Sequence, residues 1–128
     1  MRPAIREMTA ADKDAVMGIL KRTPEFNALD VIVAEEVIDA YLLSPEASGY
    51  SVYVAEVDDV VIGYIAYGST PLTLSTWDIY WVATAPDFRG RGIGTTLMRY
   101  AEAQIRKADG QLVLLETSGR EEYEATRV

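Results

Sequence analysis

The chain has 128 residues, a formal net charge of −8 at pH 7, and neither cysteine nor histidine. These counts exclude a disulfide framework, a Cys or Cys–His nucleophile, a Ser-His-Asp triad and a conventional zinc site. Any proton transfer must therefore use carboxylates, tyrosines, lysines, backbone groups or water, and we expect no metal.

The length predicts a single domain over residues 1–128. The acidic balance argues against a nucleic-acid partner, because neutralising phosphates needs a basic surface, and it favours a cationic small molecule or basic peptide. No apolar run approaches the roughly 18 residues that span a bilayer. The first residues, MRPAIREM, lack the apolar core of a signal peptide. We therefore expect a cytoplasmic protein without a membrane partner.

The N-terminal third of the sequence predicts one strand and two helices. Residues 4–8 form a short strand, and Thr9 with Asp12 resembles a capping box that opens a helix ending before Pro24. A second helix covers residues 28–43 and stops at Ser44-Pro45. Its apolar positions predict a wide apolar face made of Leu29, Ile32, Val33, Val37, Ile38, Tyr41 and Leu42.

The middle of the chain predicts a β-hairpin. Residues 50–57 and 60–67 are rich in β-branched and aromatic side chains, and Asp58-Asp59 provides the turn between them. Gly63, inside the second strand, predicts a bulge or a close contact. A loop at residues 71–75 then leads into the next strand.

Residues 76–105 carry the strongest functional signal. An apolar strand is followed by a loop that contains Pro86, and then by a helix whose buried face is predicted by apolar residues four positions apart. Gly90, Gly92 and Gly94 stand where the strand gives way to the helix, interleaved with Arg89 and Arg91. Glycines allow positive φ and a close approach of the backbone to a ligand, and a helix N-terminus favours an anion. The place therefore suits a phosphate.

Two familiar phosphate loops do not fit this spacing. The P-loop pattern is absent, because no lysine follows these glycines. The dinucleotide fingerprint G-x-G-x-x-G would start at Gly90 but has Thr95 where the third glycine belongs, and residues 85–88 separate it from the strand.

The pattern Q/R-x-x-G-x-G/A does fit, as Arg89-Gly90-Arg91-Gly92-Ile93-Gly94, and Val82 to Pro86 gives a preceding V-x-x-x-P-like segment. This stretch resembles the acetyl-CoA loop of the GNAT family of N-acetyltransferases, and the resemblance covers the chain from about Ile5 to its end. It implies acetyl-CoA as co-substrate and direct transfer of its acetyl group to an amine.

The last part of the chain completes the predicted topology. Residues 111–117 form a nearly continuous apolar run, typical of a strand that lies parallel to the preceding one across the helix. The fold class is then α+β (α/β), GNAT-like, with a mixed and mostly antiparallel sheet flanked by helices. Its order is β-α-α-β-β-β-α-β with the start of a further helix near Glu121. We expect it to lack the family's last two strands and its usual acid tyrosine, and a homodimer is one way to complete the fold.

The resemblance implies coenzyme contacts in two places. Backbone groups of the loop would wrap the pyrophosphate, with charge from the two arginines. The end of the preceding strand would pair with the pantetheine arm and stabilise the oxyanion. The cofactor-binding residues are then Val82, Ala83, Thr84, Arg89, Gly90, Arg91, Gly92, Ile93, Gly94 and Thr95.

The general base has two candidates. Asp78 lies eleven residues before Arg89, where some GNAT members carry a glutamate, and desolvation between apolar neighbours would raise its pKa. A solvent-facing Asp78 is the alternative. Glu116 is the second candidate, although an edge or substrate-facing role suits it better. The acceptor side is expected from residues 23–30, including Glu25, and from the loop at residues 71–75.

Three functions remain open from the sequence. The first is a GNAT-type acetyltransferase acting on a primary amine of a small molecule or peptide. The second is a catalytically inactive acyl-CoA-binding regulatory module. The third, a nicotinamide-binding βαβ domain with Glu116 on the ribose, conflicts with the glycine spacing.

Overall fold

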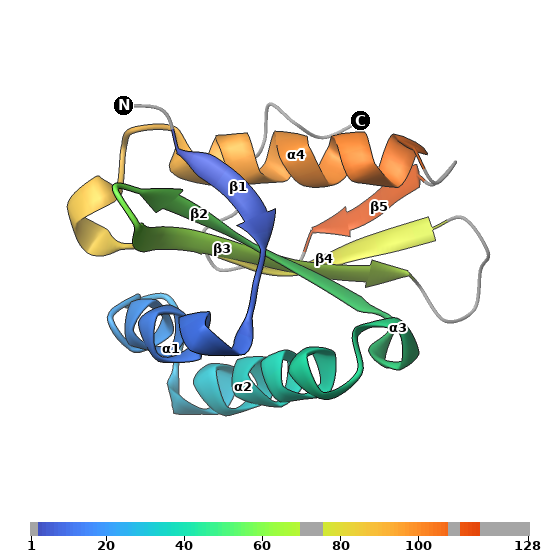
Figure 1. Ribbon diagram of the computed structural model, residues 1–128, viewed down its shortest axis with the longest axis horizontal. Helices are drawn as coiled ribbons and strands as arrows, with labels where there is room; N and C mark the ends of the chain where they lie inside the picture. The colour runs from blue at the N-terminus through green and yellow to red at the C-terminus, as the bar shows by residue number, and fades with distance from the viewer. Residues whose placement is uncertain (1–2, 70–75, 108–110, 116–128) are drawn as a thin grey trace.

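A five-stranded sheet in the order β1-β2-β3-β4-β5 organises the protein, with α1 and α2 on one face and α4 on the other (Figure 1). The computed structural model describes residues 3–69, 76–107 and 111–115, with the side chains of 69, 76–80 and 111–115 left out of the description. The strands are β1 (Ala4–Glu7), β2 (Tyr50–Val57), β3 (Val60–Ser69), β4 (Thr76–Thr84) and β5 (Gln111–Leu115). The helices are α1 (Lys13–Lys21), α2 (Ala28–Leu43), α3 (Pro45–Ser48) and α4 (Ile93–Lys107), with 3-10 turns η1 (Ala10–Asp12) and η2 (Pro86–Phe88).

The predicted order of elements and the mixed sheet are confirmed. β1 to β4 pair antiparallel, and β5 pairs parallel to β4. The Asp58-Asp59 turn is also confirmed, since both residues have positive φ, as a tight hairpin requires. The sequence missed the short α3, which Pro45 opens, and the two 3-10 turns. The predicted helix near Glu121 lies outside the described residues.

Gly63 is both beside a bulge and in close contact, as its position predicted. Ile62 is the extra residue where β3 shifts register against β2, since Val61 pairs with Glu56 and Gly63 with Ala55. A Cβ on Gly63 would lie 3.1 Å from Ile93 Cγ2, 3.2 Å from the Ala83 carbonyl oxygen and 3.2 Å from Leu97 Cδ1. The missing side chain therefore lets α4 lie directly on the sheet.

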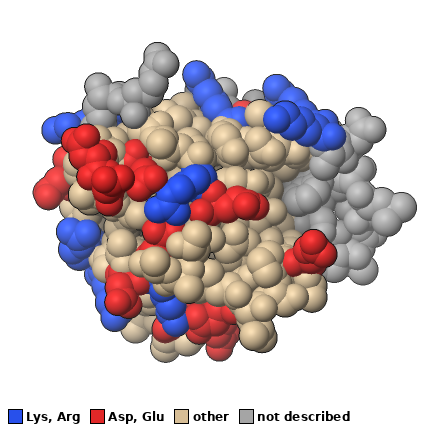
Figure 2. All heavy atoms as spheres, in the orientation of Figure 1, with Lys and Arg blue, Asp and Glu red and all other residues tan. Residues whose placement is uncertain are grey.

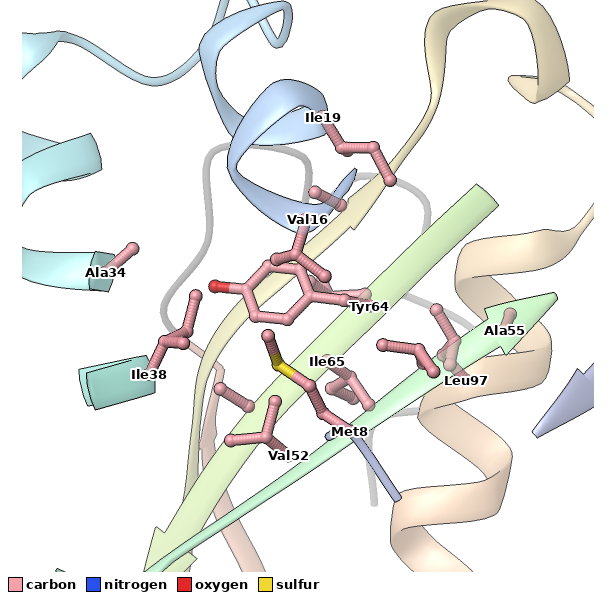
Figure 3. Close-up of a cluster of buried hydrophobic side chains, with 14 of the residues drawn as sticks. Met8, Val16, Ile19, Ala34, Ile38, Val52, Ala55, Tyr64, Ile65 and Leu97 are labelled. Carbon is pink, nitrogen blue, oxygen red and sulfur yellow. The ribbon is translucent and has the colours of Figure 1, made fainter. Parts of the chain in front are cut away.

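The core fills both spaces between the sheet and its helices. Tyr64 lies at the centre of the α1/α2 side, fully buried among Val16, Ile38 and their neighbours (Figure 3). Its hydroxyl has no hydrogen-bond partner among the described residues, and burial raises the pKa of Tyr64. On the other side, α4 buries the predicted face, namely Ile93, Leu97, Ala101 and Ile105, and adds Met98.

The wide apolar face expected on α2 is only partly buried. Ala34, Val37, Ile38 and Tyr41 face the core. Leu29 is 65% exposed, Ile32 55% and Val33 36%. The expectation failed because apolar residues surround this helix on all sides, so their spacing alone does not say which ones face inward.

An ion pair between the partly exposed Arg6 and the buried Asp12 fixes the start of α1. The Asp12 carboxylate accepts two hydrogen bonds from Arg6, at 2.8 and 2.9 Å, and one from the Thr9 backbone amide at 2.8 Å. Arg6 also reaches Glu56 of β2 at 2.8 Å. This ties η1 to the sheet and so positions α1 and the connection that follows it.

Across the described residues, no helix is long and apolar enough to span a bilayer.

Candidate active site

The glycine-rich loop has the backbone geometry expected of an anion site. Gly90 and Gly92 both adopt φ of +78°, and no described atom lies within 4 Å of the position that a Cβ would take on either residue. Residues 90–92 are exposed. Open space therefore borders the loop, and only glycine adopts this conformation without strain.

The start of α4 is directed at the same space. The helix begins at Ile93, one residue after Gly92, so its first amides lack partners within the helix and carry the positive end of its dipole. Ile93 and Gly94 are buried beneath the loop, while Thr96 donates from its amide and its hydroxyl to the Gly92 carbonyl, at 2.9 Å each. The loop is thus held on a packed helix end.

The end of β4 lies beside this helix start. Atoms of Ala83 and Ile93 both lie close to the position that a Cβ would take on Gly63, and Thr84 pairs with Gly63 in the sheet. Val82, Ala83 and Thr84 are all buried. The Thr84 hydroxyl lacks a hydrogen-bond partner among the described residues. The structure therefore brings together the two segments that the resemblance implied, although their contacts with a coenzyme stay predictions.

Among the described residues, β4 extends beyond the part that pairs with β5. The pairs run from Thr76 with Gln111 to Ile79 with Leu115, whereas β4 continues to Thr84. The backbone of Asp78 belongs to the paired part, between Gly68 and Leu114. Asp78 stands roughly 20 Å along the strand from Thr84, at about 3.3 Å per residue. The Asp78 side chain and all of Glu116 lie outside the described residues.

Arg89 is engaged by a carboxylate from a distant part of the sequence. Its Nη2 lies 2.9 Å from Glu25 Oε1 and its Nη1 3.2 Å from Glu25 Oε2, a two-bond contact. The hydrogen bonds from Arg89 lower the pKa of Glu25, so this carboxylate stays ionised at neutral pH. Glu25 belongs to the connection between α1 and α2. Sequence reasoning suggested it as a residue facing a cationic acceptor, and no local pattern could reveal its pairing with Arg89.

The other charged residues near the loop have different surroundings. The Arg91 guanidinium carbon lies 5.5 Å from the centre of the Phe88 ring, a cation–π distance. On the face seen in Figure 2, basic side chains line the upper edge over α4, while acidic ones gather over the turn between β2 and β3. Local positive charge therefore borders the helix in a chain whose net charge is −8.

No metal site emerges in the part of the chain that the structure describes, since no three Asp or Glu residues there gather closely enough to hold an ion. The chemistry available near the loop is hence that of backbone amides, two arginines, a hydroxyl and carboxylates. This set can bind a polyanion and polarise a carbonyl.

Comparisons with known proteins agree with this geometry. The family model described as "Acetyltransferase (GNAT) family" matches residues 14–124. A comparison with curated protein sequences finds no match. Among solved structures, a GNAT-family protein from Desulfovibrio desulfuricans is 32% identical, with a TM-score of 0.82 over 88% of this chain and 72% of that one.

Two further solved structures share the architecture. A GNAT acetyltransferase from Brucella melitensis, determined in complex with acetyl-CoA, is 25% identical, with a TM-score of 0.69 over 88% of this chain and 74% of that one. The ribosomal-protein-alanine N-acetyltransferase of Brucella melitensis biovar Abortus 2308 is 18% identical, with a TM-score of 0.75 over all of this chain and 92% of that one, and this likeness concerns the fold alone. With a family model that matches residues 14–124, a glycine loop of the expected geometry and the matching sheet order, the chain belongs to the GNAT family of acetyltransferases.

Proposed function

We propose that the protein transfers the acetyl group of acetyl-CoA directly to a primary amine of a small molecule or peptide. The observation that carries this proposal is the loop at residues 90–92, whose two glycines adopt positive φ beside open space at the start of α4. The relative from Brucella melitensis determined with acetyl-CoA supports the choice of coenzyme. The net charge of −8 supports a cationic acceptor.

The coenzyme pyrophosphate would bind at the glycine loop. Amides from Arg89 to Thr95 would donate to its oxygens, and the guanidinium groups of Arg89 and Arg91 would balance its charge. The open space beside Gly90 and Gly92 supports this placement, because a side chain on either glycine would enter it.

The pantetheine arm would follow the last residues of β4. Among the described residues, the pairing with β5 reaches Ile79, and no described residue of β5 pairs with Ala83 or Thr84. An extended arm beside these residues would lead from the pyrophosphate toward the middle of β4. At the end of β4, an amide from Val82 to Thr84 would stabilise the oxyanion that forms at the thioester carbonyl, an effect that can reach about 3 kcal/mol.

Asp78 is the proposed general base. The ammonium form of the amine loses a proton to it, the neutral nitrogen bonds to the thioester carbon, and the carbon–sulfur bond breaks. The second proton that the nitrogen loses balances the proton that the CoA thiolate takes up from water. Val82 lies about 13 Å from Asp78 along β4, at about 3.3 Å per residue, so the proton would reach the carboxylate through intervening water. Glu116 remains the second candidate. Asp78→Asn should lower kcat/KM and remove its rise with pH, and an unchanged profile would assign the base elsewhere.

The first test is calorimetric titration of acetyl-CoA into the whole chain and a Gly92→Glu variant. Gly49→Glu is the matched control, because Gly49 has φ of +77° with no described atom within 4 Å of the place of a Cβ, and it closes α3 at the other end of the sheet (Figure 1). We expect micromolar binding that Gly92→Glu abolishes and Gly49→Glu preserves. Absence of binding to the folded wild-type chain would reject the proposal.

Turnover can be followed by CoA thiol release with a thiol-reactive reagent, because the chain has no cysteine to give a background signal. An amine panel should contain cationic small molecules and basic peptides. Coenzyme binding with no turnover on the panel would favour the alternative, an inactive acyl-CoA-binding module.

The homodimer and the cytoplasmic location stay predictions from the sequence. Sedimentation of the whole chain would test the first.

A further inference from the structure

The ion pair between Glu25 and Arg89 joins two loops that the sequence separates by 64 residues. It links the connection between α1 and α2 to the first residue of the glycine-rich motif. Both side chains are about one-third exposed, at 32% for Glu25 and 33% for Arg89. In the protein without coenzyme, therefore, the Glu25 carboxylate accepts the hydrogen bonds of the Arg89 guanidinium. The proposed function assigns this same guanidinium to the coenzyme pyrophosphate.

The connection that carries Glu25 is anchored on both sides. The Thr23 hydroxyl is buried and donates to the Ile19 carbonyl at 2.7 Å, and the Phe26 amide donates to the Thr23 carbonyl at 3.1 Å. Asn27 then caps α2 by accepting from the Asp30 amide at 2.8 Å, while Asp30 accepts in return at 3.0 Å. The backbone of Glu25 is held near Arg89, so its carboxylate can move away only by side-chain rotation.

A phosphate and the Glu25 carboxylate make the same kind of contact with a guanidinium. Both accept two parallel hydrogen bonds from its planar edge. Arg91 differs, because its neighbour is the uncharged ring of Phe88. An arriving pyrophosphate therefore competes with Glu25 for the hydrogen bonds of Arg89.

We propose that Glu25 exchanges with the coenzyme pyrophosphate on Arg89, weakening coenzyme binding and hastening the release of CoA. This inference rests on the proposed function, since it takes the glycine loop as the coenzyme site. Glu25 acts through Arg89 and is a positioning residue. When CoA leaves, the Glu25 carboxylate again accepts the hydrogen bonds of Arg89, so the charge of Arg89 is balanced both with and without the coenzyme.

The experiment measures CoA affinity and dissociation rate for the wild-type chain, Glu25→Gln and Glu36→Gln. Glu36 is an exposed residue of α2 outside the site, and its substitution changes the net charge by the same amount. We expect Glu25→Gln to bind CoA roughly three- to tenfold more tightly, mostly through slower dissociation, while Glu36→Gln stays close to wild type. The Tm of both variants should stay near that of wild type, since a partly exposed pair contributes little to stability.

A second pair of variants tests whether Glu25 acts through Arg89. In an Arg89→Met background, adding Glu25→Gln should change CoA affinity less than twofold. Equal or weaker CoA binding by Glu25→Gln in the wild-type background would overturn the proposal. The same gain in both backgrounds would also overturn it, because the effect would then be general repulsion. If the folded wild-type chain binds no CoA, the proposed function fails first and this inference falls with it.

Discussion

Substitution of Gly63 by alanine tests how closely the sheet supports the coenzyme loop. Its Cβ would meet Ile93 Cγ2 at 3.1 Å, Leu97 Cδ1 at 3.2 Å and the Ala83 carbonyl oxygen at 3.2 Å. These distances are shorter than ordinary van der Waals contacts, and one of the three atoms belongs to the backbone of the neighbouring strand. Relief therefore requires the Ile93 and Leu97 side chains and the β4 backbone at Ala83 to shift by a few tenths of an ångström.

Two opposing contributions set the magnitude. Overpacking in a filled core costs about 1–3 kcal/mol. Replacing glycine with alanine where the backbone allows it stabilises a protein by about 0.4–1 kcal/mol, because the unfolded chain has less freedom. We expect Gly63→Ala to lose about 1–2 kcal/mol of unfolding free energy and, through displacement of Ile93, to bind acetyl-CoA several-fold more weakly.

Gly18→Ala is the matched control for this prediction. Gly18 lies within α1, and no described atom is within 4 Å of the place that a Cβ would take there. The same substitution at this position should stabilise the chain by about 0.5–1 kcal/mol. Urea unfolding compares the free energies, and calorimetry the acetyl-CoA affinities. If Gly63→Ala is as stable as Gly18→Ala, the close packing of α4 on β3 does not constrain the loop.

Three further substitutions have defined outcomes. Asp12→Asn should lower the free energy of unfolding by about 2 kcal/mol at neutral pH, because hydrogen bonds from Arg6 lower the pKa of Asp12 from 3.8 to about 2. This contribution is present above pH 4 and is lost as the pH falls through about 2. Urea titrations should therefore show wild type and variant converging between pH 5 and pH 2, and a constant gap would contradict the assignment. Tyr64→Phe removes a buried hydroxyl that has no partner among the described residues and should leave thermal stability equal or raise it. Thr84→Val should likewise preserve stability yet weaken acetyl-CoA binding, and unchanged affinity would mean that the Thr84 hydroxyl does not meet the coenzyme.

Local patterns predicted the elements well. The four-residue spacing that starts at Ile93 identified α4, because one side of that helix is apolar and the other is charged. The Asp58-Asp59 pair identified the hairpin turn, since these residues tolerate positive φ better than most. The glycine spacing at residues 90–94 identified the loop and, through it, the family.

Long-range features escaped the same reasoning. Spacing failed for α2, where Leu29 and Ile32 are exposed, because apolar residues occur all round that helix. It also could not pair Glu25 with Arg89, since nothing in the sequence near either residue specifies the other. Asp30, a second acidic residue suited to the acceptor side, instead caps α2 through Asn27. A charged loop residue can thus face a ligand, pair with a distant cation or cap a helix, and only the folded geometry selects one of these roles.

An unsatisfied hydroxyl and a tightly packed glycine lie at the end of β4, beside which we propose that the coenzyme arm runs. Thr84 keeps a buried hydroxyl without a described partner, and it pairs with Gly63, the residue against which α4 packs closely. An unpaired buried hydroxyl costs about 1–3 kcal/mol, so its retention at the end of β4 is a stability loss without benefit to the free protein. A ligand with polar groups along this strand would recover that cost on binding. Under the proposed function, part of the coenzyme's binding free energy would come from a hydrogen bond to the Thr84 hydroxyl.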